Sequence, residues 1–286
     1  MLQLLLVSLC LVNSVENPTP QKKVLLIGID GCRPDALLLA KAPHLRSLIK
    51  NGAFSDKAQT GDITVSGSGW GSLLTGVWRE KHGVRGNDFK LSNFAEFPDL
   101  LARIKKAQPN RFVASVVHWE PIQKQIVKKA DVTTAYKTDA QVAKAAVELL
   151  REKNPDLLFI HFDDVDGAGH KHGFHPKQPK YMEAIEKTDE YVGTLLKTLE
   201  QRRSYQQEDW LIVVSTDHGG SGKGHGQNIP EHRTIFLIVS GKSAARGTIE
   251  PAPVIVDIAP TVFQHLGIPI DPKWGLDGKA VGLKPR

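Results

Sequence analysis

The sequence has little cysteine, no long apolar run and no cluster of basic residues. Only 2 of its 286 residues are Cys, too few for a disulfide framework or a cysteine-based zinc site. The apolar stretch at residues 2–12 (LQLLLVSLCLV) is shorter than the roughly 20 residues that span a bilayer. Lys and Arg together number 37 against 31 for Asp and Glu, but they form no basic run typical of a nucleic-acid-binding module. The modest positive excess fits an anionic ligand.

The overall composition is that of a globular protein. Hydrophobic residues make up 41% and charged residues 24% of the chain, which excludes disordered, collagen-like and multi-span membrane proteins. We find no internal repeat, no low-complexity segment and no linker within residues 22–286. The sequence therefore predicts a single domain over residues 22–286.

The N-terminal segment is typical of the apolar region of a signal peptide, and small or permissive residues follow it at Val12-Asn13-Ser14. We therefore predict a signal peptide at residues 1–14, export to the periplasm or outside the cell, and no membrane span in the mature chain. No Lys or Arg precedes the apolar run, however. The alternatives are a buried N-terminal strand or helix, or an anchor that stays attached.

Apolar runs alternate with amphipathic stretches along the chain. The runs predict strands at residues 24–29, 111–117, 157–162, 210–215 and 234–239. The amphipathic stretches predict helices at residues 42–50, 98–106, 139–152, 181–201 and 257–266, and a helix beginning at Ser72. This alternation predicts an α/β fold, a three-layer α/β/α sandwich with a mostly parallel central sheet.

Carboxylates and imidazoles follow three of the predicted strands. In open α/β sheets, sites form at the carboxyl ends of the strands, so these side chains are expected to converge. Asp and His are ligands for zinc and similar ions. The candidate ligands are Asp30, Asp166, His170, Asp217, His218 and His225.

Six ligands are too many for one tetrahedral ion and suit two divalent ions at three ligands each. A pair of metals can stabilise both the attacking and the leaving oxygen of an in-line displacement at phosphorus. Zinc is the expected metal, with manganese and iron as alternatives. The remaining histidines of this segment are expected to be structural, because none lies in such a motif: His161, His172, His175 and His232.

A Gly/Ser-rich loop, residues 64–72, precedes the helix predicted from Ser72. The N-terminus of a helix favours phosphate, and a hydroxyl held there on a metal would be an effective nucleophile. Thr64, Ser66 and Ser68 are all candidates from spacing alone, and a helix-capping role is the alternative for the serines.

The order of these pieces resembles that of the alkaline phosphatase superfamily, most closely its nucleotide pyrophosphatase/phosphodiesterase branch. The resemblance covers nearly all of residues 22–286. It is carried by IGIDGCRPD (27–35), LTGVWREKHG (74–83), Asp166-x-x-Gly169-His170, TDHG (216–219), GHG (224–226) and the C-terminal stretches VDIAPT (256–261) and LDG (276–278).

The resemblance implies roles for individual residues. It makes Ser66 the nucleophile and implies two zinc sites, one formed by Asp30, Ser66, Asp217 and His218 and the other by Asp166, His170 and His225. The Gly67 backbone N–H and Asn87 are candidates to support the phosphoryl oxygen, and a turn role is the alternative for Asn87. Trp70 is a candidate for lining the leaving-group pocket, with a packing role as its alternative.

The implied function is metal-dependent hydrolysis of a small-molecule phosphate ester. A phosphodiesterase or nucleotide pyrophosphatase acting through a covalent phospho-enzyme intermediate is expected. The alternatives are a phosphomonoesterase, a sulfatase-like enzyme or a phosphonate hydrolase of the same superfamily, and more remotely an exported non-catalytic metal-binding protein. Residues 66–70 read SGSGW, which lacks the Cys-x-Pro-x-Arg motif of formylglycine sulfatases or its Ser equivalent.

Overall fold

The computed structural model describes residues 19–285, so the predicted signal peptide at residues 1–14 lies outside the described residues. The strands are β1 (Gln21–Ile29), β2 (Ala53–Gln59), β3 (Val113–Val117), β4 (Val132–Ala135), β5 (Leu157–Phe162), β6 (Glu208–Ser215), β7 (Thr234–Gly241) and β8 (Gly247–Thr248). The α-helices are α1 (Pro34–Leu39), α2 (Pro43–Asn51), α3 (Ser66–Thr75), α4 (Arg79–His82), α5 (Leu100–Ala107), α6 (Asp139–Glu152), α7 (Asp164–His172), α8 (Pro179–Glu200), α9 (Pro230–Arg233) and α10 (Ile258–Leu266). Short 3₁₀ or π-helical turns lie at Ile122–Ile126, Tyr205–Gln207, Ile255–Asp257 and Pro272–Trp274. Among the described residues, no helix is both long and apolar enough to cross a membrane.

All the described strands belong to one sheet, in the order β4-β3-β5-β1-β6-β7-β2-β8. Each neighbouring pair is parallel except the two pairs that β7 makes with β6 and β2. The mostly parallel sheet is therefore confirmed, with β7 as the strand that runs the other way. The apolar-run criterion missed β2 and β4, because β2 alternates buried and partly exposed residues and β4 is a four-residue strand.

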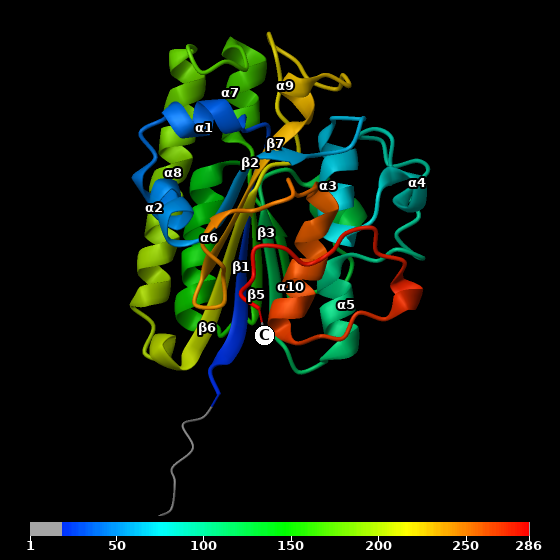
Figure 1. The fold of residues 1–286 in the computed structure, drawn as a ribbon, viewed down its shortest axis with the longest axis vertical. Coiled ribbons are helices and arrows are strands. Elements are labelled where there is room, and N and C mark those ends of the chain that lie inside the picture. The colour runs from blue at the N-terminus through cyan, green and yellow to red at the C-terminus, as the bar shows by residue number, and fades with distance from the viewer. Residues whose placement is uncertain (1–18, 286) are drawn as a thin grey trace, which may run out of the picture.

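Helices cover both faces of the sheet, as Figure 1 shows. Leu25 and Ile27 of β1 pack with α1, α2, α6, α7 and α8 in one apolar cluster. Val24 and Leu26 point to the other face and pack with α3, α5 and α10 in a second cluster. Because successive side chains of a strand point to opposite faces, the continuous apolar run of β1 serves both layers. The predicted three-layer arrangement is confirmed.

Helix α3 begins at Ser66, six residues before the predicted start at Ser72. Its first half is rich in Gly and Ser, which have weak helix propensity, so the pattern indicated a loop. All ten of its residues are buried, and Trp70, Leu73 and Leu74 join an apolar cluster. Tertiary packing therefore stabilises this helix and places Ser66 at its N-terminus.

Helix α7 was not predicted, because Gly167 and Gly169 interrupt its apolar pattern. A Cβ on Gly169 would lie 2.2 Å from the Phe174 ring, so close packing requires glycine there. Asp166 and His170 stand four residues apart on this helix and therefore share one face.

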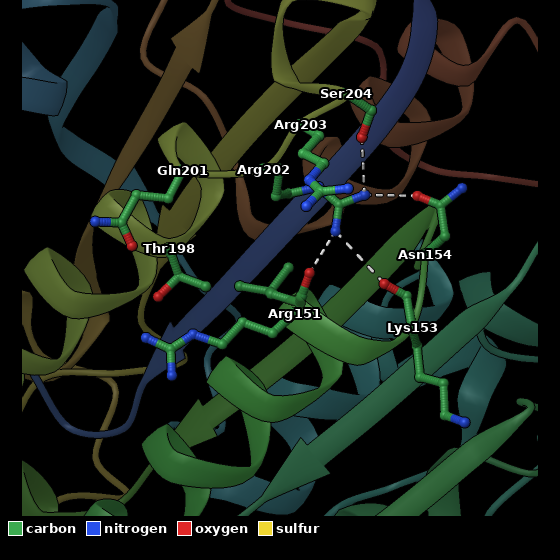
Figure 2. A pocket seen from close by; sticks show the side chains of 9 residues that line it. Arg151, Lys153, Asn154, Thr198, Gln201, Arg202, Arg203 and Ser204 are labelled. Carbon is green, nitrogen blue, oxygen red and sulfur yellow. Dashed lines mark hydrogen bonds between the residues drawn. The ribbon is translucent and has the colours of Figure 1, made fainter.

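Figure 2 shows a hollow of about 510 Å³ whose lining includes the basic residues Arg151, Lys153, Arg202 and Arg203. These residues lie at the ends of α6 and α8 and in the segments that lead into β5 and β6. Arg202 forms an ion pair with Glu208 (2.8 Å) and also donates to Asn154 Oδ1 (2.6 Å) and the Leu150 carbonyl. Binding the last carbonyls of a helix is a usual role for cations at a helix C-terminus. We therefore assign Arg202 to holding the ends of α6 and α8 in place.

Candidate active site

The first group of polar side chains, cluster 1, consists of Asp30, Ser66, Asp217 and His218. Asp30 directly follows β1, Asp217 and His218 follow β6, and Ser66 begins α3. The Nε2 atom of His218 lies 3.5 Å from Asp30 Oδ1, 3.3 Å from Asp217 Oδ2 and 3.4 Å from Ser66 Oγ. All four side chains are buried. The ligand atoms of Asp30, Asp217 and His218 lie within 4.8 Å of one another, close enough to bind one ion, and Ser66 Oγ lies beside them.

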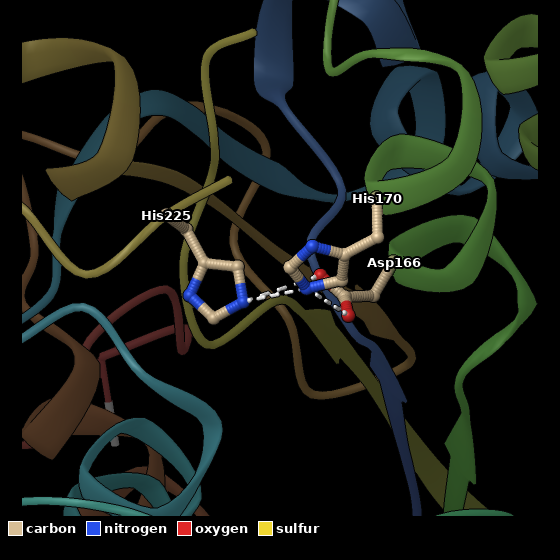
Figure 3. Close-up of side chains that lie close together, drawn as sticks. All are labelled: Asp166, His170 and His225. Carbon is tan, nitrogen blue, oxygen red and sulfur yellow. Dashed lines mark hydrogen bonds and ion pairs between the residues drawn. The ribbon is translucent and has the colours of Figure 1, made fainter. Parts of the chain in front are cut away.

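The second group, cluster 2, consists of Asp166 and His170 from α7 and His225 from the loop between β6 and β7 (Figure 3). The His170 Nε2 atom lies 3.0 Å from His225 Nε2 and 3.2 Å from Asp166 Oδ2. Asp166 Oδ1 lies 3.8 Å from His225 Nε2. The ligand atoms of cluster 2 are therefore close enough together to bind one ion.

The two clusters adjoin. The rings of His218 and His225, one from each cluster, stack with centroids 3.8 Å apart. Gly31, which follows Asp30, has a φ of +63°, and a Cβ there would lie 2.5 Å from Asp166 Oδ1. The turn after β1 therefore requires glycine on two grounds, backbone conformation and the close approach of cluster 2.

Backbone carbonyls fix the protonation of the three cluster histidines. The Nδ1 atoms of His218, His170 and His225 lie 2.8, 3.0 and 2.8 Å from the carbonyl oxygens of Gly219, Lys223 and Thr64. A carbonyl can only accept, so in the neutral form of each ring Nδ1 carries the proton and Nε2 presents a lone pair. The facing lone pairs of His170 and His225 repel unless a cation lies between them. This second-neighbour arrangement is the one that metal-ligating histidines use.

The carboxylates provide the complementary half of the donor set. Within the described residues, Asp30 Oδ1, Asp166 Oδ1 and Asp217 Oδ2 are buried and have no hydrogen-bond partner. These are the same three oxygens that face the Nε2 atoms of His218 and His225. A buried carboxylate oxygen without a partner is costly, so buried carboxylates usually pair with cations or coordinate metals. The donor set fits two divalent ions.

The pKa values reflect this crowding. Burial, together with the charges of Asp30 and Asp163, raises the pKa of Asp166 to about 9. Burial and the charges of Asp30 and Asp166 raise the pKa of Asp217 well above its ordinary value. Burial and the neighbouring His225 lower the pKa of His218 to about 3, so its ring is neutral and able to bind a metal at neutral pH.

The structure thus brings together all six candidate ligands and Ser66, grouped as the resemblance implies. Of the three hydroxyls that spacing left open, Ser66 Oγ contacts His218 Nε2, whereas Thr64 Oγ1 donates to the Gln227 carbonyl (3.0 Å). The identity and number of the metal ions and the nucleophilic role of Ser66 stay predictions.

Asn87 lies beside the nucleophile candidate. Its Oδ1 accepts the backbone N–H of Gly67 at 2.8 Å. The N–H of Gly67, a candidate to support a phosphoryl oxygen, is therefore already engaged. Because Oδ1 faces this donor, the two N–H groups of the amide point away from it. Asn87 is exposed, so its amide remains accessible.

The expectation that Trp70 lines a substrate pocket does not agree with its position. Its side chain is fully buried under β1, and its indole Nε1–H donates to Asp30 Oδ2 at 2.8 Å. His161, expected to be structural, contacts the same oxygen from β5, with its Nε2 at 3.1 Å. A polar residue inside the apolar run LLFIHF was the signal that could have drawn attention to His161.

A family model described as type I phosphodiesterase / nucleotide pyrophosphatase matches residues 24–135 and 94–231 of the chain. The bis(5′-adenosyl)-triphosphatase of Bos taurus is 24% identical over 220 residues, which cover 69% of this chain and 47% of that protein. Ectonucleotide pyrophosphatase/phosphodiesterase family member 5 of Homo sapiens is 25% identical over 219 residues, covering 70% of this chain and 45% of that protein. The chain thus spans about half the length of these curated relatives.

Solved structures share the fold. An inactive variant of murine ectonucleotide pyrophosphatase/phosphodiesterase 5, in complex with AMP, superposes with a TM-score of 0.72 at 16% identity, covering 88% of this chain and 96% of that one. A 2-O GAG sulfatase also gives a TM-score of 0.72, at 14% identity, covering 91% of this chain and 73% of that one. At these identities the likeness concerns the fold alone.

Proposed function

Because the chain belongs to the type I phosphodiesterase / nucleotide pyrophosphatase family, we propose that it hydrolyses phosphodiesters at a two-metal site with Ser66 as nucleophile. We propose small nucleotides as the substrate class, since a solved structure with the same fold, a variant of murine ectonucleotide pyrophosphatase/phosphodiesterase 5, is in complex with AMP. We also propose that residues 22–286 form one catalytic domain and that the protein is exported.

The observation that carries the proposal is the matched donor set. The Nε2 atoms of three histidines face three carboxylate oxygens that have no hydrogen-bond partner among residues 19–285. These atoms form two adjoining groups, and Ser66 Oγ lies beside one of them. Cluster 1 would hold one ion through Asp30, Asp217, His218 and Ser66. Cluster 2 would hold the other, and zinc suits this Asp/His donor set.

Bound divalent ions would lower the pKa of the Ser66 hydroxyl and neutralise charge on the leaving oxygen. Ser66 lies at the N-terminus of α3, where the positive end of the helix dipole favours a phosphoryl group. In-line attack forms a bond from Ser66 Oγ to phosphorus and breaks the bond to the leaving alcohol, which departs with the serine proton. Water then cleaves the phosphoserine and restores the hydroxyl. In this proposal the exposed amide N–H of Asn87, which lies beside Ser66 through its contact with Gly67, donates to a phosphoryl oxygen during both steps.

The first test compares turnover of bis-p-nitrophenyl phosphate with that of p-nitrophenyl phosphate on zinc-loaded protein of known metal content. We expect the diester to be preferred at least tenfold in kcat/KM, which corresponds to about 1.4 kcal/mol of transition-state discrimination. A preference for the monoester would move the assignment to a phosphatase. No turnover of either ester by protein that binds two metals would contradict the proposal.

The second test concerns the nucleophile. Ser66→Ala should lose turnover while still binding metal at both clusters, because the remaining ligands are intact. Ser68→Ala is the matched control, since Ser68 is also buried on α3 but lines a different hollow, together with Asp62 and Arg79. Wild-type turnover in Ser66→Ala would show that the nucleophile is another group.

A further inference from the structure

The two carboxylate oxygens of Asp30 have different surroundings. Oδ1 faces His218 and, within the described part of the chain, has no hydrogen-bond partner. Oδ2 is contacted by the Trp70 Nε1 atom at 2.8 Å and by the His161 Nε2 atom at 3.1 Å. Hydrogen bonds therefore orient the carboxylate through Oδ2, while Oδ1 is available to bind a cation.

Both contacts to Oδ2 are hydrogen bonds from the ring to the carboxylate. The indole N–H of Trp70 can only donate. The Nδ1 atom of His161 accepts the Trp119 backbone N–H at 3.5 Å, so a neutral His161 ring carries its proton on Nε2, facing Asp30. This is the opposite tautomer to that of His170, His218 and His225. His161 therefore lies near Asp30 and Asp163 as a donor and not as a metal ligand.

The two donors support one another. The rings of Trp70 and His161 meet edge to face, with centroids 4.7 Å apart, and both side chains are fully buried. Gly28 of β1 leaves space for the indole, because a Cβ there would lie 2.3 Å from Trp70 Cη2. Neither ring can move away from Oδ2 without displacing the core.

We propose that Trp70 and His161 are positioning residues that lock Asp30 Oδ2 and thereby aim Oδ1 at the cation of cluster 1. The inference rests on the proposed function, because it concerns the metal that this function requires. The partners that orient metal ligands commonly change metal affinity by about 10- to 100-fold when they are removed. Trp70 and His161, together called the clamp, contact Asp30 of cluster 1. Removing either contact should therefore weaken zinc binding at cluster 1 and leave zinc binding at cluster 2 unchanged.

The test is the zinc affinity of each cluster, measured by competition with a chromophoric chelator. Trp70→Phe and His161→Leu each remove one hydrogen-bond donor from Oδ2. Each should lower the zinc affinity of cluster 1 by at least tenfold, whether cluster 1 is the tighter or the weaker of the two sites. Asp217→Asn and His225→Ala, which each remove a ligand from one cluster, identify which binding step belongs to which cluster. The second binding step should stay within about threefold of wild type.

His161→Gln supplies the rescue. Its side-chain amide can place an N–H near the position of the imidazole Nε2, so we expect it to keep most of the affinity that His161→Leu loses. His265→Leu is the matched control for destabilisation, because His265 is equally buried but bonds to the carbonyls of Lys23 and Asp209, away from both clusters. It should bind both ions as the wild type does.

The outcomes separate this inference from the proposed function. If the wild-type protein binds fewer than two ions, the two-metal function fails. If the wild type binds two ions but Trp70→Phe leaves both affinities unchanged, or weakens both clusters equally, the clamp is refuted. Should His161→Leu not fold, Trp70→Phe and His161→Gln still decide the question. If His161→Gln binds zinc at cluster 1 as weakly as Trp70→Phe does, the N–H donor at that position does not set the affinity and the proposal is refuted.

Discussion

Replacing Gly28 by alanine should destabilise the protein far more than a surface substitution would. The new Cβ would lie 2.3 Å from Trp70 Cη2 and 2.5 Å from Cζ3, more than 1 Å inside the ordinary carbon–carbon contact of about 3.5 Å. Overpacking of this kind typically costs about 1–3 kcal/mol. If the indole shifts, its hydrogen bond to the Asp30 carboxylate is also lost, which costs about 1.5–3 kcal/mol more. The expected loss is therefore about 3–6 kcal/mol out of a total stability of about 5–15 kcal/mol.

The assay is urea unfolding in the presence of a chelator, so that metal binding does not enter the free energy of unfolding. Trp70→Phe replaces the indole, which the new Cβ would contact, by a smaller ring. The loss of stability in the double variant Gly28→Ala/Trp70→Phe should therefore be smaller than the sum of the two single losses by at least about 1 kcal/mol. Gly167→Ala is the matched control, because Gly167 is exposed on α7 and no atom of the described residues lies within 4 Å of a Cβ there. This substitution should stabilise the protein slightly. A Gly28→Ala protein within about 0.5 kcal/mol of wild type, or strictly additive single effects, would refute the packing argument.

Three further predictions concern catalysis, pH and metal. Asn87→Ala should lower kcat/KM for the diester by about 100-fold without a change in metal content, as loss of one oxyanion donor does; steady-state kinetics on the metal-analysed protein would show whether it does. Burial raises the pKa of Asp99, the N-cap of α5, to about 6. The protonated carboxyl therefore contributes its full stability below the pKa of the unfolded chain, about 4, and this contribution is lost as the pH rises through about 6. The free energy of unfolding of Asp99→Asn, relative to that of the wild type, should therefore rise by up to about 3 kcal/mol between pH 4 and pH 7. Urea titrations that give the same difference between the two proteins at both pH values would contradict this. Removing metal with a chelator should lower the Tm, and adding zinc should restore it. A Tm that changes with neither the chelator nor zinc would argue against bound ions.

The sequence was informative wherever one local pattern determined the structure. The apolar runs located β1, β3, β5, β6 and β7, and the positions after three of them located every carboxylate and histidine of the two clusters. The pattern places the start of helix α3 six residues too late and misses α7, because their glycines oppose a helix locally. The burial of Trp70 in the core stabilises α3, and the packing of Phe174 against Gly169 stabilises α7. The hydrogen bonds of Trp70 and His161 to Asp30 depend on the pairing of β1 with β5 and on the placement of α3, so no local pattern could have revealed them.

The two clusters join parts of the chain that are distant in sequence. Ser66 and His218 are 152 positions apart, and His170 and His225 are 55 positions apart. Ions held by these residues would act as cross-links that close long loops, which is the role disulfides play in many exported proteins. Among the residues described, Cys32 is the only cysteine, and it is buried and unpaired. Ionic cross-links of this kind would make resistance to proteolysis depend on the supply of metal rather than on the redox state of the surroundings.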